Sequence, residues 1–464
     1  MLEKCRLSLT YSVRIGSPSP FPSPPWRGED RWPRWEESRI DGDPAVVESV
    51  SLSPGERGGV RASVPLTEFF RLRIFAVLSS VALSLLCPAT GASAKGAEPK
   101  PVPLGVANVS LQNEVRRAID KGLSWLEKNQ DTNGYWSTPD HPAITALALV
   151  AFQGKPNEDK RGMESETIKK GYAYLLGCVK PDGSIYSKKE LLNYNTAVSM
   201  MALLAANRPE YKPVLLKARQ FLVGSQVDLD EPGKTDNVFD GGVGYGSKYE
   251  HSDMSNTLLA LEALYYSRHL VADQNLAGAR DLNWPAAIHF IQSCQNLPEY
   301  NKEKWASSDP QNKGGFIYYP GQSMAGETNL PSGRVAFRSY GSASYAGLLS
   351  YIYANLTRED PRVVAVMDWL RNNYTLAENP GLGPQGIFYY YHTMTKALTV
   401  YGADYIELKD GSKINWRQEL ALKLMNLQLK DGSWMNQNGR WWEKDPVLVT
   451  AYAIISLEMV DRAL

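Results

Sequence analysis

The C-terminal three quarters of the chain repeats one short pattern, and an internal repeat restricts the fold more than any other feature of a sequence. The first copy, at residues 121–136, reads Lys-Gly-x-x-Trp-Leu-x-x-x-Gln-x-x-x-Gly-x-Trp and is followed by an apolar segment that begins at Thr145. The last copy has the same Gln, Gly-x-Trp turn and Thr-led segment within residues 421–457. Each copy predicts two helices joined through a glycine turn.

Four weaker copies lie between these two, with turns at Gly183, Gly242, Gly314-Gly315 and Gly386, which makes six copies in all. A single pair of helices leaves an apolar face uncovered, so the copies must stack, and six can close into a ring. We predict an all-α fold over residues 111–464, an α/α toroid (an α6/α6 double barrel) of six helix-hairpin repeats. The aromatic after each turn is expected to pack on the outer helix, and the Gln to bond the neighbouring turn.

The N-terminal part of the chain has a different character. Residues 1–70 are rich in Pro, Ser and Arg without apolar periodicity, and they are interpreted as a disordered extension or an over-long start. A positive start at Arg71, an apolar run over 74–86 and a small-residue site ending at Ala94 then predict a signal peptide over 71–94. Residues 95–110 are expected to be a linker. The run is too short for a membrane span, so we expect an exported protein without an integral span.

Composition excludes some partners. The 464 residues are 43% hydrophobic, and 50 basic residues balance 50 acidic ones, so the formal net charge is zero. A nucleic-acid partner is therefore disfavoured. The cysteines beyond the signal peptide, Cys178 and Cys294, lie in apolar helical patterns and are expected to be buried free thiols. No signal for an oligomeric state is present.

The motif at 121–136 resembles the QW motif of the superfamily that contains squalene–hopene cyclases, oxidosqualene cyclases and the β-subunits of protein prenyltransferases. The resemblance covers about residues 111–464. It implies that the ends of the inner helices face a central cavity, which would hold a small hydrophobic or a polymeric ligand.

The third copy resembles the Asp-x-Asp-Asp-Thr signature of class II terpene cyclases, whose middle Asp is the proton donor. Here the segment reads Asp253-Met-Ser255-Asn256-Thr257, so a serine stands at the donor position. A serine hydroxyl does not protonate an alkene, and an acid would have to be Asp253 itself or the nearby Glu250. The other interpretation is that Asp253 or Ser252 caps the inner helix.

The prenyltransferases of the superfamily hold zinc with an Asp, a Cys and a His. His392 matches the segment that carries the His, but the residues around Tyr340, where the partners should stand, include neither Asp nor Cys. The diphosphate-binding Asp-rich pattern is also missing. We therefore expect no metal and no cofactor, and we place His392 on the cavity wall.

Aromatic residues gather between the expected outer and inner helices. They stack on sugars or face cations in some toroids, and they pack loops in others. The candidates for the cavity wall are Tyr245, Ser255, Asn256, Tyr318, Tyr319, Tyr340, Tyr389, Tyr390, Tyr391, His392, Trp441, Trp442 and Asp445.

The sequence is compatible with three functions. The first is a toroid that binds a hydrophobic or extended ligand without the usual proton donor. The second is a divergent terpene cyclase, an isomerase, with Asp253 or Glu250 as its acid. The third is a carbohydrate-active toroid, in which Asp253 and Asp445 would have to face each other across the cavity.

Overall fold

The computed structural model describes residues 108–156, 165–246, 251–272, 281–330 and 333–464. The expected N-terminal extension, the signal peptide and most of the linker lie outside these residues, as does Glu250. None of the described helices is long and apolar enough to cross a membrane.

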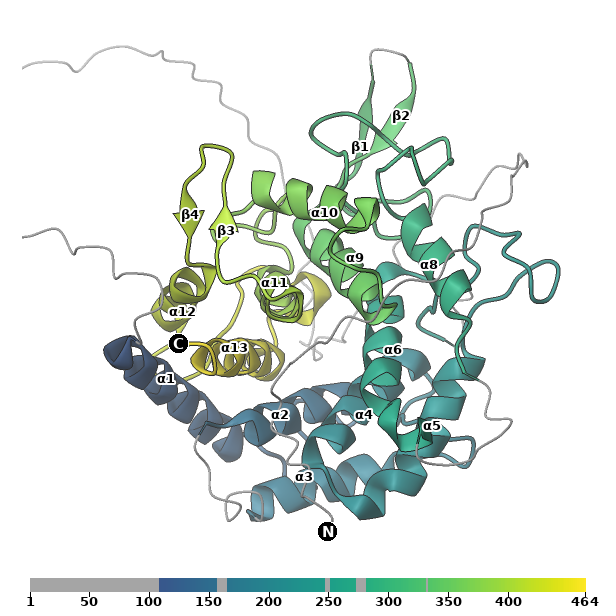
Figure 1. Cartoon of the computed structure of the whole chain (residues 1–464). Helices are drawn as coiled ribbons and strands as arrows, with labels where there is room; N and C mark the ends of the chain where they lie inside the picture. The colour runs from purple at the N-terminus through teal and green to yellow at the C-terminus, as the bar shows by residue number, and fades with distance from the viewer. Residues whose placement is uncertain (1–107, 157–164, 247–250, 273–280, 331–332) are drawn as a thin grey trace, which may run out of the picture. The chain divides into compact units, whose positions relative to one another are not determined.

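Inner and outer helices alternate along the described part of the chain and form an α/α toroid (Figure 1). The inner helices are α2 (Pro142–Gly154), α4 (Leu192–Ala206), α6 (Met254–Ser267), α9 (Gly341–Tyr353), α11 (Ile387–Tyr401) and α13 (Pro446–Asp461). Each packs against the next, and α13 packs against α2, so these helices close a ring.

The outer helices cover the outside of this ring. They are α1 (Val109–Lys128), α3 (Glu166–Gly177), α5 (Lys212–Gly224), α8 (Trp284–Ser293), α10 (Pro361–Asn372) and α12 (Trp416–Leu427). Small elements lie in the links: α7 (His269–Ala272), the 3-10 turns η2 (Pro209–Tyr211) and η3 (Arg440–Trp442), and the hairpins β1 (Glu327–Asn329) with β2 (Val335–Phe337) and β3 (Ile406–Glu407) with β4 (Lys413–Ile414).

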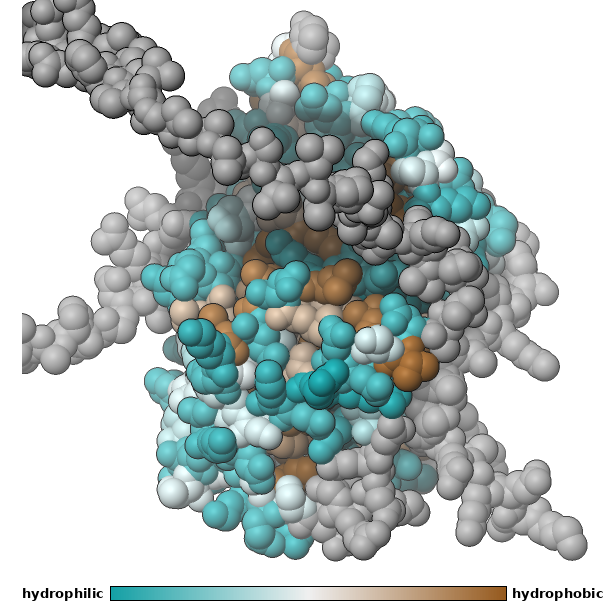
Figure 2. Space-filling view, turned by 90° about the vertical axis from the view of Figure 1, so that its left-hand side faces the viewer, coloured by the Kyte–Doolittle hydropathy of each residue, from teal (hydrophilic) through white to brown (hydrophobic). Residues whose placement is uncertain are grey.

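The two sets of helices differ in burial. In α1, residues Val115, Ile119 and Leu126 are buried at helical spacing while the opposite face meets solvent. In α13, every residue from Val447 to Asp461 is buried, because neighbours cover it on both sides. The outside of the ring is mainly hydrophilic where Figure 2 shows it, with hydrophobic residues in separate patches.

The glycine turns join neighbouring units. The amide of Gln130 donates to the carbonyl of Gly134 in its own turn (3.0 Å) and to that of Thr167 at the start of the next outer helix (2.8 Å). Gln428 donates in the same way to Gly432 (2.9 Å) and to Ala118 of α1 (2.8 Å), which links the last unit to the first. The Gln therefore bonds its own turn and the next outer helix, and not the neighbouring turn as we had predicted.

The aromatic and the threonine of the motif have defined partners. The indole N–H of Trp136 donates to the carbonyl of Leu126 on its own outer helix (2.7 Å), as predicted. Its backbone N–H donates to the hydroxyl of Thr145 on α2 (3.0 Å). The threonine thus ties the turn to the inner helix, which explains why the inner segments begin with it.

Two predicted turns differ from the structure. In the third unit the residue with positive φ is Gly241 (φ +87°), one position before the predicted Gly242. In the fifth unit Gly386 directly precedes α11 and is not the turn of a Gly-x-aromatic motif. The buried amide of Asn379 organises that link instead, by bonding the backbone N–H and the hydroxyl of Ser342.

Candidate functional site

All the inner helices begin at the same end of the ring, which we call the N-terminal rim. Hydrogen bonds between each inner N-terminus and a neighbouring unit establish this. The bonds are Ala143 N–H to Asn195 Oδ1, Asn193 N–H to Tyr245 O, Met254 N–H to Tyr318 O, Gly341 N–H to Pro380 O, Tyr389 N–H to Glu443 Oε1 and Ser137 Oγ–H to Asp445 Oδ2. The predicted site segments are therefore brought to one end of the toroid.

Asp253 lies at this rim as the N-cap of α6 and is fully buried. Its carboxylate accepts the backbone N–H of Asn256 (2.9 Å) and the side-chain amide of the same residue (2.7 Å). Burial raises the pKa of Asp253 to about 6, although the hydrogen bonds from Asn256 favour the charged form. The geometry is that of a helix cap, which is the second of the two interpretations of this residue.

Tyrosines surround Asp253. The hydroxyls of Tyr318 and Tyr245 lie 3.4 Å apart. Burial, with the nearby charge of Asp253 as a smaller cause, raises the pKa of both phenols, and burial likewise raises the pKa of Tyr340, the residue before α9. Burial also raises the pKa of Tyr389 to about 12. Phenols with raised pKa values remain neutral hydrogen-bond donors at physiological pH.

Tyr452 of α13 extends this group along the inside of the ring. Its ring centroid lies 6.0 Å from that of Tyr389 and 4.9 Å from that of His392. Tyr194 of α4 hydrogen-bonds it, and burial raises the pKa of the Tyr194 phenol. Sequence reasoning did not select Tyr194 or Tyr452, although both lie two residues from a motif threonine, Thr196 or Thr450.

His392 has an unusual environment for a titratable group. Its side chain is 7% exposed, and its Nδ1 has no hydrogen-bond partner among the described residues. Burial, with a smaller contribution from Lys396, lowers the pKa of His392 well below its ordinary value, so the imidazole is neutral. Within the part of the chain that the structure describes, no cluster of three or more His, Cys, Asp or Glu residues can hold a metal ion.

Several predicted wall residues lie elsewhere. Tyr389, Tyr390 and Tyr391 were expected in a link but belong to α11. The hydroxyls of Tyr390 and Tyr391 donate to the carbonyls of Thr375 (2.9 Å) and Leu376 (2.6 Å), so these two side chains pack α11 against the preceding link.

Tyr319 lies next to the Tyr318–Tyr245 pair, with its ring centroid 5.3 Å from that of Tyr318. Its ring packs on His251, with the centroids 4.6 Å apart, and on Phe239. It therefore covers the link that leads to α6.

Trp441 and Trp442 lie at the rim with about two fifths of their surface exposed, and both have positive φ (53° and 65°). The carboxylate of the next residue, Glu443, is buried and accepts the backbone N–H of Tyr389 (2.8 Å). This contact fixes the strained turn to the start of α11.

Asp445, like Asp253, is the N-cap of an inner helix. It caps α13, where it accepts the backbone N–H of Val447 (2.8 Å), and Ser137 donates to its other oxygen. In the order of the inner ring, α6 and α13 occupy opposite positions. Each carboxylate is therefore bonded to the start of its own helix, on opposite sides of the inner ring.

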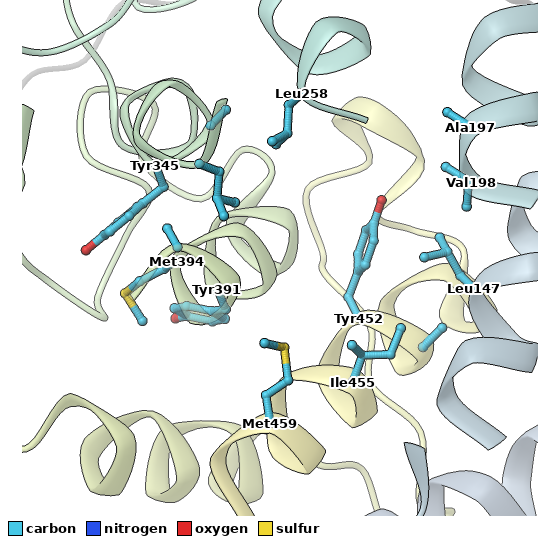
Figure 3. Packing of buried hydrophobic residues seen from close by; sticks show 14 of the residues in the cluster. Leu147, Ala197, Val198, Leu258, Tyr345, Tyr391, Met394, Tyr452, Ile455 and Met459 are labelled. Carbon is cyan, nitrogen blue, oxygen red and sulfur yellow. The ribbon is translucent and has the colours of Figure 1, made fainter. Parts of the chain in front are cut away.

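The faces of the inner helices that point toward the ring axis form the second part of the site; we call them the axial faces. Figure 3 shows Leu147, Val198, Leu258 and Tyr452 projecting inward from four helices. Several side chains in the middle of the inner helices are partly exposed, although outer helices cover the outward side of the same helices. They are Val150 on α2, Met201 on α4, Leu259 on α6, Ile352 on α9 and Lys396 on α11. Among the described residues, the axial faces are therefore mainly apolar, and they are partly exposed at these five positions.

The fold and this arrangement define the protein as an α/α toroid with a tyrosine-rich rim and a mainly apolar axis. No family model matches the chain, and no curated protein matches it. Among solved structures, the type II terpene cyclase MstE from Scytonema matches with a TM-score of 0.44 and 11% identity, over 76% of this chain and 99% of that one.

Two glycosidases have a similar arrangement of helices. The GH76A α-1,6-mannanase from Salegentibacter sp. HEL1_6 matches with a TM-score of 0.48 and 13% identity, over 75% of this chain and 99% of that one. A GH76 α-mannanase of Bacteroides thetaiotaomicron matches with a TM-score of 0.46 and 11% identity, over 75% and 96%. At these values none of the three activities transfers to this chain.

Proposed function

We propose that the protein is a toroid that binds a hydrophobic or extended ligand along its axis, acting outside the cytoplasm after its predicted signal peptide is removed. The observation that carries this proposal is the combination of two features. Apolar side chains on the axial faces are partly exposed in the middle of the inner helices, while two of the candidate carboxylates, Asp253 and Asp445, are engaged as helix caps. Concave sites lined by apolar and aromatic groups are typical of small-molecule binding.

Blocking the axis tests this proposal. The binding of radiolabelled squalene and of a shorter polyprenyl chain would be measured by equilibrium dialysis. In Met201→Trp the larger ring would occupy the axis, and we expect affinity to fall at least about tenfold, which corresponds to about 1.4 kcal/mol. Leu422→Trp places the same ring on the exposed face of α12 and is the matched control.

Two results would contradict the proposal. One is the absence of binding of any apolar probe to the wild-type protein. The other is an equal affinity of the Met201→Trp variant and the wild type, with both variants folded by circular dichroism.

A divergent terpene cyclase is a second candidate, because one observation favours it. Asp253 is fully buried among phenols, and its pKa is raised to about 6, so a fraction of the carboxyl groups is protonated near neutral pH. An acid kept partly neutral in an aromatic pocket is the kind of group that proton-initiated cyclisation needs.

Mass spectrometry separates this candidate from simple binding. Squalene and shorter polyprenyls would be incubated with the wild-type protein and with Asp253→Asn. Cyclised products from the wild type alone would establish the cyclase. Binding without product from either protein would leave the toroid as a binding protein for these compounds.

A further inference from the structure

One ion pair crosses the inside of the ring. The ammonium of Lys396 on α11 lies 2.5 Å from the carboxylate of Glu262 on α6. In the order of the inner ring α9 lies between these two helices, so the pair has to pass over the axial face of α9. The hydroxyl of Tyr353 on α9 lies 3.4 Å from the same carboxylate. The ion pair therefore belongs to the interior of the toroid, at a distance from the tyrosines of the rim.

Two further polar side chains share this face of α11. His392, Lys396 and Thr399 follow each other at spacings of four and three residues, which places them on one side of a helix. The Nδ1 of His392 and the hydroxyl oxygen of Thr399 are buried, and neither has a hydrogen-bond partner among the described residues. Buried polar atoms are nearly always hydrogen-bonded in folded proteins, so each of these atoms indicates a missing partner. Seven residues of helix separate the two by about 10 Å, so one small group cannot reach both, and Thr399 is the one that the experiment tests.

The charges of these groups indicate what the occupant is. Lys396 and Glu262 cancel each other, and the threonine and the buried imidazole add no net charge. An anionic ligand would have to compete with Glu262 for the ammonium, and a cationic ligand would compete with Lys396 for the carboxylate. Burying an unbalanced charge in this apolar surrounding costs several kcal/mol. A neutral group that both donates and accepts a hydrogen bond fits without that cost, and a hydroxyl is the smallest such group.

We propose that Thr399 and the Lys396–Glu262 pair form a polar subsite on the axis, which holds the terminal hydroxyl of an amphipathic alcohol while its hydrocarbon part lies against the apolar axial faces. This inference rests on the proposed binding function and names the ligand class of that same site. The hydroxyl donates to Glu262, and it accepts from Thr399 or Lys396.

A series of ligands with one chain length tests the inference on the full-length protein. Dodecane, 1-dodecanol, dodecanoate and dodecylamine would compete with a bound fluorescent apolar probe. We expect 1-dodecanol to bind the wild-type protein most tightly. In Thr399→Val, which keeps the shape of the side chain, the affinity for the alcohol is expected to fall about fivefold to tenfold, while that for dodecane stays within about twofold, because one hydrogen bond is lost.

The controls make each outcome decisive. Thr132→Val makes the same change at an exposed position and is expected to leave all four affinities unchanged. Equal binding of alcohol and hydrocarbon by the wild-type protein, or tightest binding of dodecanoate or dodecylamine, would overturn the hydroxyl subsite and leave the proposed function intact. If no member of the series binds, both the subsite and the proposed function fail.

Discussion

At the scale of single residues, Asp253 caps α6, but burial destabilises the ionised form of its carboxyl group. Burial raises its pKa from 3.8 to about 6, so the folded protein binds a proton there more strongly than the unfolded chain does. Stability from this group is complete below about pH 4 and is lost as the pH rises through about 6. The shift corresponds to a loss of about 3 kcal/mol over that window.

We expect Asp253→Asn to lack this loss, because the amide oxygen still caps α6 but has no proton to release. The free energy of unfolding in urea, measured between pH 4 and pH 7, should fall by about 2 kcal/mol more in the wild type than in the variant. Asp368→Asn changes an exposed carboxyl on α10 and serves as the control. Parallel pH profiles for the wild type and Asp253→Asn would show that this carboxyl does not gain protons on folding.

The residue roles that could be predicted from the sequence are those with a local signal. The cap at Asp253 follows from a short polar residue placed directly before an apolar helical run. The pairing of Tyr452 with Tyr194 and His392 had no such signal, since it joins three inner helices that are distant in the chain. The sequence predicts Tyr390 and Tyr391 in the link before α11, whereas both lie in the helix. The reason is that Asn379 organises this link, which ends earlier than a link with a glycine turn would.

At the scale of elements, the glycine turn is the unit that sets the fold. Gly432 has φ +99°, and a Cβ at this position would lie 2.6 Å from the carbonyl oxygen of Lys121 on α1. Both the backbone conformation and the close approach of the neighbouring helix therefore require glycine. This explains why the motif can be recognised in the sequence even where its aromatic and its Gln have been replaced.

Gly432→Ala is expected to lower the free energy of unfolding by about 2 kcal/mol or more, because a side chain strains the left-handed backbone and displaces α1. Gly177→Ala is the matched control, since a Cβ there meets nothing within 4 Å and φ is not positive. The alanine in α3 should be neutral or slightly stabilising. Chemical denaturation of the two variants compares them directly, and equal midpoints would show that the turn tolerates a side chain.

At the scale of the whole molecule, closure of the ring brings the two ends of the described chain together. Gln112 and Arg116 of α1 bond the backbone carbonyl and the carboxylate of Asp461 on α13, at 3.0 and 2.9 Å. Closure was foreseen from the number of copies, because stacked helix pairs leave two apolar faces at their ends that can cover each other. The polar groups that hold the closure could not be predicted, since neither Arg116 nor Asp461 belongs to the repeated motif.

Ends that lie side by side should tolerate a new connection. A circular permutant can join Leu464 to Asn108 by a short Gly-Ser linker and open at the exposed β3–β4 tip, between Asp410 and Gly411. We expect this permutant to keep the helical content of the linear 108–464 chain and to melt within a few degrees of it. This opening cuts a surface hairpin and leaves every contact between inner helices intact. A permutant opened between Ile454 and Ile455 interrupts α13, which is buried along its length, and should not fold. If both permutants melt at the same temperature, the order of the helices in the ring does not depend on closure by α13. If neither permutant folds while the linear chain does, the contacts of α1 with α13 do not join the two ends as the structure describes.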